Sequence, residues 1–95
     1  MSVEPEDLET VSDHFRRKGG LDHLRVRKWG KSIVIYSGDD STRDNHARVT
    51  LIGPDTWGLS LAHHTGRWER TPFVGELDEL LDTLTSNFGA FLEKG

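Results

Sequence analysis

The chain has 95 residues, of which 34% are hydrophobic and 29% are charged, and it carries a formal net charge of −4. This length suits one globular domain, residues 1–95, with a core of modest size. Because the chain has no cysteine, disulfides, thiol nucleophiles and thiolate zinc sites are excluded. No apolar run approaches the roughly 18 residues of a membrane span. The acidic N-terminus lacks the features of a signal peptide. We therefore expect a cytoplasmic protein that makes no use of a membrane.

The first predicted element is an amphipathic helix over residues 5–18. Pro5 suits the first turn of a helix, where its missing N–H costs nothing. Leu8, Val11 and Phe15 follow at spacings of three and four, which places them on one face. Gly19 and Gly20 then favour the end of the helix.

The middle of the chain, residues 23–71, alternates apolar and polar residues in the manner of antiparallel strands. We expect strands near 24–29, 31–36, 47–52 and 57–62, and a short edge strand near 67–70. Gly30-Lys31 suits a tight turn of type II′, and the polar stretch 38–45 suits a loop. One face of the fourth strand carries only Gly58, Ser60 and Ala62, so a helix or a ligand can approach the sheet closely there.

The last predicted element is a helix over residues 76–93, with an apolar stripe that includes Leu77, Leu81, Leu84 and Phe88. The element order predicts an α+β fold: an N-terminal helix, an antiparallel meander of four to five strands and a C-terminal helix, packed as a two-layer sandwich. Each helix has one apolar stripe and is expected to dock on the sheet. The pattern leaves open whether both helices dock on the same face.

Charge is distributed unevenly along the chain. Residues 1–13 carry five acids and no base, whereas residues 14–33 carry seven bases and one acid. This basic run is either a solvated surface whose charge is neutralised by the acidic helices, or an electropositive patch that binds an acidic partner or nucleic acid. The element order is similar to that of a double-stranded-RNA-binding domain, whose last helix begins with a basic cluster that contacts phosphates. Glu76, Asp78 and Glu79 stand at that position here and exclude this mode of binding.

Metal and catalytic motifs are sparse. His63 and His64 point to opposite faces if they lie in a strand, so they cannot both bind one ion there. The acidic stretch around Asp39 and Asp44 lacks the alternating carboxylates of a calcium loop. No nucleophile elbow, phosphate-binding loop or dinucleotide fingerprint is present. We therefore expect no metal, no cofactor and no catalytic residue, although an enzyme is left open.

Aromatic residues accompany the basic run, since the chain has three tryptophans. Trp57 is expected in the core, while Trp29 at a hairpin tip is hard to bury. Trp68 and Phe73 either clamp the sheet edge to the last helix or belong to a recognition surface, because Trp and Arg are enriched in binding hot spots.

Together these features predict a small non-enzymatic interaction or regulatory domain. We expect it to bind an acidic protein partner, or a second copy of itself as a homodimer, through a basic and aromatic hairpin surface. One alternative is a nucleic-acid-binding module that uses the same strip, with Trp29 stacking on a base. Another is a small ligand-binding or catalytic domain around His63, His64 and Asp55. The candidate partner-binding residues are Arg25, Arg27, Lys28, Trp29 and Lys31 of the hairpin, with Arg67, Trp68 and Arg70 expected nearby.

Overall fold

The computed structural model describes residues 3–17, 23–38, 44–62 and 67–89. In chain order the elements are α1 (Pro5–Arg17), β1 (Arg25–Trp29), β2 (Ser32–Ser37), β3 (Asp44–Gly53), β4 (Thr56–Ala62), β5 (Trp68–Gly75) and α2 (Leu77–Asn87). The five strands form one sheet in the order β1-β2-β3-β4-β5, and every neighbouring pair is antiparallel. The α+β fold class predicted from the sequence is confirmed.

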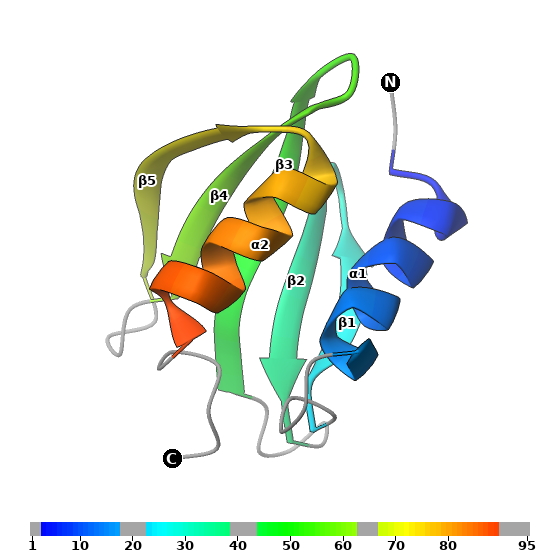
Figure 1. Ribbon diagram of the computed structural model, residues 1–95, viewed down its shortest axis with the longest axis vertical. Helices are drawn as coiled ribbons and strands as arrows, with labels where there is room; N and C mark the ends of the chain where they lie inside the picture. Colours follow the sequence, from blue (N-terminus) through cyan, green and yellow to red (C-terminus); the bar gives the residue numbers. More distant parts are fainter. Residues whose placement is uncertain (1–2, 18–22, 39–43, 63–66, 90–95) are drawn as a thin grey trace.

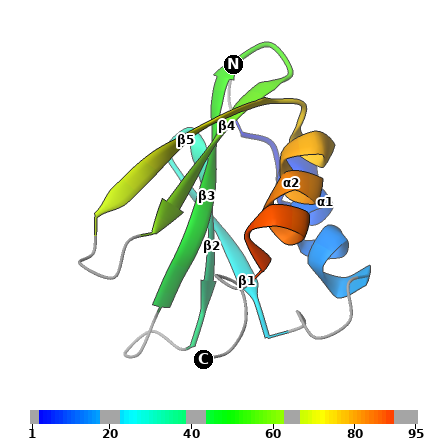
Figure 2. The same ribbon diagram turned by 60° about the vertical axis from the view of Figure 1, so that its left-hand side comes forward.

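Both helices lie on the same face of the sheet, which the sequence pattern left open (Figure 1). Seen from the side, the two described helices form one layer, and neither of them covers the other face of the sheet (Figure 2). α1 contacts β1 and α2, while α2 also contacts β4 and β5. The molecule is therefore a two-layer sandwich with one covered face and one helix-free face.

The core lies between the two layers and follows the apolar stripes seen in the sequence. Val11 and Phe15 enter it from α1, and Leu81 and Leu84 enter it from α2. Trp57 is 4% exposed and belongs to the core, as expected. The sheet contributes the residues on the helix side of its three central strands: Ile33, Ile35, Ala47, Val49, Leu51, Trp57, Leu59 and Leu61.

The sheet differs from the sequence expectation at its boundaries. β3 begins at Asp44, inside the stretch 38–45 that was expected to be a loop, because Asp44 and Asn45 pair with the end of β2 across a register shift. Residues 39–43 of that stretch lie outside the described residues. β5 reaches Gly75 rather than ending near 71. It does so despite Pro72 because β5 is an edge strand, where a missing N–H costs no ladder bond.

The last predicted helix, residues 76–93, is interrupted at Phe88, and Gly89 is helical again. α2 covers Leu77–Asn87, whereas the stripe predicted residues 76–93, of which 90–93 lie outside the described residues. Phe88 leaves the helical conformation, with φ −124° and ψ 25°, and its backbone N–H bonds to the carbonyl of Leu84. The Phe88 ring packs edge-on against Phe73 of β5, with ring centroids 5.8 Å apart. This contact fixes the end of α2 to the sheet.

The turn between β1 and β2 requires glycine. Gly30 has φ +61°, a left-handed conformation in which a Cβ atom is unfavourable. An added Cβ at Gly30 would meet no atom within 4 Å, so the cost of a side chain is conformational rather than steric. We expect Gly30→Ala to lower the free energy of unfolding by about 1–2 kcal/mol, as measured by urea denaturation. An unchanged midpoint would show that this hairpin tolerates a different turn.

Candidate functional site

The candidate site is the helix-free face of the sheet, on which three arginines stand in one row. The register pairs Arg27 with Val34, Val34 with Arg48, Arg48 with Ser60 and Ser60 with Arg70. Cross-strand partners project to the same side of a sheet, and Val34 is absent from the core cluster that contains its neighbours Ile33 and Ile35. We call Arg27, Arg48 and Arg70 the arginine row. They occupy β1, β3 and β5, so successive arginines are two strand spacings, about 10 Å, apart.

Further arginine and tryptophan residues lie on the same face as the arginine row. Arg25 and Trp29 share its face at the β1 edge, since each lies two residues from Arg27 along the strand. Trp68 lies on this face at the β5 edge, opposite Ala62. We call this surface the basic face; it comprises Arg25, Arg27, Trp29, Arg48, Trp68 and Arg70.

The inner arginines are held against the sheet. Arg27 and Arg48 flank Val34, which is fully buried although no helix covers it. Their Nε atoms are inaccessible to solvent and have no hydrogen-bond partner. Because Nε lies near the end of the side chain, its burial shows that the aliphatic stems of both arginines are packed on the sheet. These stems are thus partly fixed before any partner arrives.

Arg48 also covers Trp68. The guanidinium carbon of Arg48 lies 4.7 Å from the centroid of the Trp68 ring, which is cation–π geometry. The expectation that Trp68 clamps the sheet edge to the last helix is therefore wrong, because Trp68 faces away from α2. Phe73, on the opposite side of β5, makes that contact through Phe88.

A hollow of about 320 Å³ lies beside the arginine row, over β3, β4 and β5. One side is formed by Arg48, Ser60 and Arg70. The next cross-strand row consists of Thr50, Gly58 and Val74 and forms the other side. Two of the three small residues singled out on the fourth strand, Gly58 and Ser60, therefore line a surface depression on the face opposite the helices, whereas Ala62 lies outside it.

The structure brings only some of the expected partner-binding residues together. Arg25, Arg27 and Trp29 lie on the basic face, but Lys28 pairs with the core residue Ile33 and so faces the helix side. Lys31 lies in the turn, and Arg67 precedes β5. The sequence pattern predicts that the hairpin lies near Arg67, Trp68 and Arg70. This prediction is wrong, because β1 and β5 are the two opposite edges of the sheet.

Arg48 completes the surface, and sequence reasoning missed it. It lies at the centre of the row, between the two groups of residues that the sequence singled out. The alternation of Ala47, Val49 and Leu51 with more polar residues signalled that Arg48 lies on the second face of β3. Only the strand register shows that it stands between Arg27 and Arg70.

The structure gives no support for the alternative of a ligand-binding or catalytic site around His63, His64 and Asp55, in the part of the chain that it describes. His63 and His64 lie outside the described residues, and Asp55 lies in the turn between β3 and β4. His14 contacts α2 instead, with its Nε2 3.5 Å from Thr85 Oγ1 and 3.8 Å from Asp82 Oδ1. Within residues 3–17, 23–38, 44–62 and 67–89, no three His, Asp or Glu side chains gather as metal ligands do.

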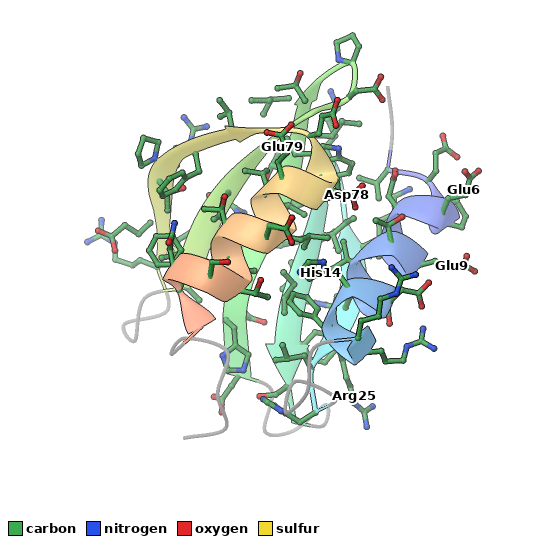
Figure 3. All side chains as sticks on the ribbon, viewed as in Figure 1. Glu6, Glu9, His14, Arg25, Asp78 and Glu79 are labelled. Atoms are coloured by element: carbon green, nitrogen blue, oxygen red, sulfur yellow. The ribbon has the colours of Figure 1, made fainter. Side chains whose placement is uncertain are left out.

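Acidic residues are concentrated on the opposite layer. Glu6, Glu9, Asp78 and Glu79 project from the two helices, as the side-chain view shows (Figure 3). The described ion pairs, Arg16–Asp13 and His14–Asp82, involve helix residues only. In the described part of the chain, the arginines of the basic face form no ion pair. The acidic helices therefore do not neutralise this face.

No family model, no curated protein and no solved structure matches this chain. Neither of the two described helices has both the length and the apolar character needed to cross a bilayer.

Proposed function

We propose that this chain is a non-enzymatic binding module whose basic face docks an acidic protein surface. The observation that supports the proposal most is the arginine row. Arg27, Arg48 and Arg70 line up across all five strands on a helix-free face, and none of them is paired with a described carboxylate. Arginine is well suited to this role, because its planar guanidinium matches a carboxylate with two parallel hydrogen bonds.

The electrostatics of the whole molecule support the same reading. A chain of net charge −4 repels most anionic partners at long range. The basic face is the exception, because the acids of α1 and α2 lie on the other side of the sheet. An acidic partner is therefore oriented toward this one face, and electrostatic complementarity of this kind adds to association rate and specificity.

A nucleic acid is the less favoured occupant. Single-stranded nucleic acids bind to sheets by stacking bases on exposed aromatic rings. The Arg48 guanidinium already occupies one face of the Trp68 ring. Trp29 is 55% exposed but lies on β1, at the edge of the sheet farthest from Trp68. Two separated rings, one of them covered, form no continuous stacking platform.

The proposal is tested by titrating a fluorescent glutamate-rich peptide and a single-stranded oligonucleotide of equal charge into the purified protein. We expect the peptide to bind more tightly than the oligonucleotide. Replacement of Arg25 and Arg70, both exposed, by glutamine is expected to weaken peptide binding about tenfold, in keeping with the loss of two rim charges. Raising the salt concentration should weaken binding further by screening.

The matched control replaces Arg16 and Arg17 of α1 by glutamine, which removes the same charge from the helix layer. We expect this variant to bind like the wild type. Equal losses in both variants would show that net charge alone governs binding and would contradict the proposal. Tighter binding of the oligonucleotide would assign the face to nucleic acid. Concentration-dependent mass in sedimentation of the protein alone would identify a second copy, with its acidic helix layer, as the occupant.

A further inference from the structure

The hollow of the basic face has two chemically different sides. On one side, Arg48 and Arg70 flank Ser60, a buried residue that is 6% exposed. On the other side, Ile52 and Val74 are exposed apolar side chains, at 55% and 61%. These two large aliphatic residues have no neighbouring layer to cover them, unlike the core residues of the opposite face.

Gly58 forms the floor between the two apolar residues. A Cβ added at Gly58 would lie 3.8 Å from Ile52 Cδ1 and 3.8 Å from Val74 Cγ1, which is ordinary van der Waals distance. The sheet therefore does not require glycine at this position for space. The absence of a side chain leaves the depression open between Ile52 and Val74, where an atom from a partner is at contact distance to both.

We infer that this hollow receives an acidic and an apolar side chain that stand side by side on one segment of the partner protein. The carboxylate lies over Ser60 between Arg48 and Arg70, and the apolar side chain enters between Ile52 and Val74 over Gly58. The inference rests on the proposed function and specifies the chemistry of the segment that docks. Ser60 and Gly58, the floors of the two sides, are two residues apart on β4 and therefore about 7 Å apart. Residues i and i+2 of an extended partner segment have the same spacing.

The paired chemistry favours a protein segment over other anions. A phosphate or a polyanionic backbone satisfies the arginines but leaves Ile52 and Val74 in contact with water. An aliphatic side chain covers them and gains free energy in proportion to the apolar area removed from water. The volume of about 320 Å³ is at the small end of ligand-binding pockets, which suits one or two side chains.

The test uses two labelled peptides of equal charge and length. In the first, Glu-Ser-Leu-Ser repeats place glutamate and leucine on one face of an extended chain; in the second, serine replaces every leucine. We expect the wild-type protein to bind the leucine peptide about tenfold more tightly, since burial of a leucine is worth at least that factor. An oligonucleotide of equal charge is the third probe.

Two variants separate the hollow from the charge of the face. Gly58→Val fills the depression and keeps every arginine, while Val74→Ser removes one apolar wall at an exposed position. Each variant is expected to reduce the preference for leucine to less than about twofold while binding the serine peptide like the wild type. Urea denaturation monitors folding, and Gly58→Ala replaces Gly58→Val if the larger side chain unfolds the protein.

The outcomes distinguish this inference from the proposed function. If the wild type binds both peptides equally, or if Gly58→Val and Val74→Ser retain the preference, the inference is overturned. The proposed function then stands provided that Arg25→Gln/Arg70→Gln still weakens the binding of both peptides. If neither peptide binds, or if the oligonucleotide binds most tightly, the inference and the proposed function fall together.

Discussion

Truncation of Phe15 to alanine is expected to lower the free energy of unfolding by about 3–5 kcal/mol, the usual range for a buried phenylalanine. Phe15 is 2% exposed and projects from α1 into the core cluster between the helices and the sheet. α1 contacts only β1 and α2 among the elements with substantial contacts in the described structure. Loss of the Phe15 ring therefore removes a main anchor of the helix.

The measurement is urea denaturation followed by far-ultraviolet circular dichroism. A domain of this kind has a total stability of about 5–15 kcal/mol, so the variant loses a large share of it. Arg17→Ala serves as the control, because it truncates an exposed side chain of the same helix. A loss below about 1 kcal/mol at Phe15 would indicate that α1 is not docked as described.

The helices and strands could be predicted because each obeys a local period. Leu8, Val11 and Phe15 repeat at helical spacing, and Ala47, Val49 and Leu51 alternate, so each element shows its buried face without reference to its neighbours. The position of β5 could be predicted only in part. Pro72 is a local signal against a strand, and its tolerance at the sheet edge depends on strand order, which is a tertiary property.

The basic face could be predicted only in fragments for a similar reason. The sequence brings Arg25, Arg27 and Trp29 together because they are neighbours in the chain. Arg48 is isolated in the sequence and joins them through the pairing of β2 with β3. Which side of β5 carries Trp68 likewise depends on the register shift between β4 and β5. A pattern along one strand does not contain the register that aligns it with another.

Local sequence patterns also could not predict that both helices dock on the same face of the sheet. Each amphipathic helix shows that it has an apolar stripe, but not which side of the sheet accepts it. The decision lies in the sheet, where Ile33, Val49 and Leu59 make one face continuously apolar across the central strands. The opposite face carries Arg48 between Val34 and Ser60. A third layer on that side would have to bury the arginine row, which is expensive for unpaired charges.

Replacement of Arg48 by methionine is expected to weaken binding of the glutamate-rich peptide at least 30-fold, equivalent to about 2 kcal/mol. Arg48 lies at the centre of the arginine row, and the residues that dominate binding energy cluster at the centres of interfaces. Its charge also lies beside the hollow. The exposed Arg25 and Arg70 lie at the edges of the sheet, where solvent screens their interactions and smaller effects are expected.

The same substitution should change stability little. Methionine keeps an unbranched apolar stem over Val34 and removes the buried Nε that has no partner. That gain opposes the lost cation–π contact with Trp68, worth about 0.5–1 kcal/mol. The free energy of unfolding is therefore expected to stay within about 1 kcal/mol of the wild type. A large loss of stability would show that Arg48 is needed for folding. Unchanged peptide affinity would remove it from the interface. A large loss of affinity without loss of stability would indicate that this arginine is kept for binding rather than for the fold.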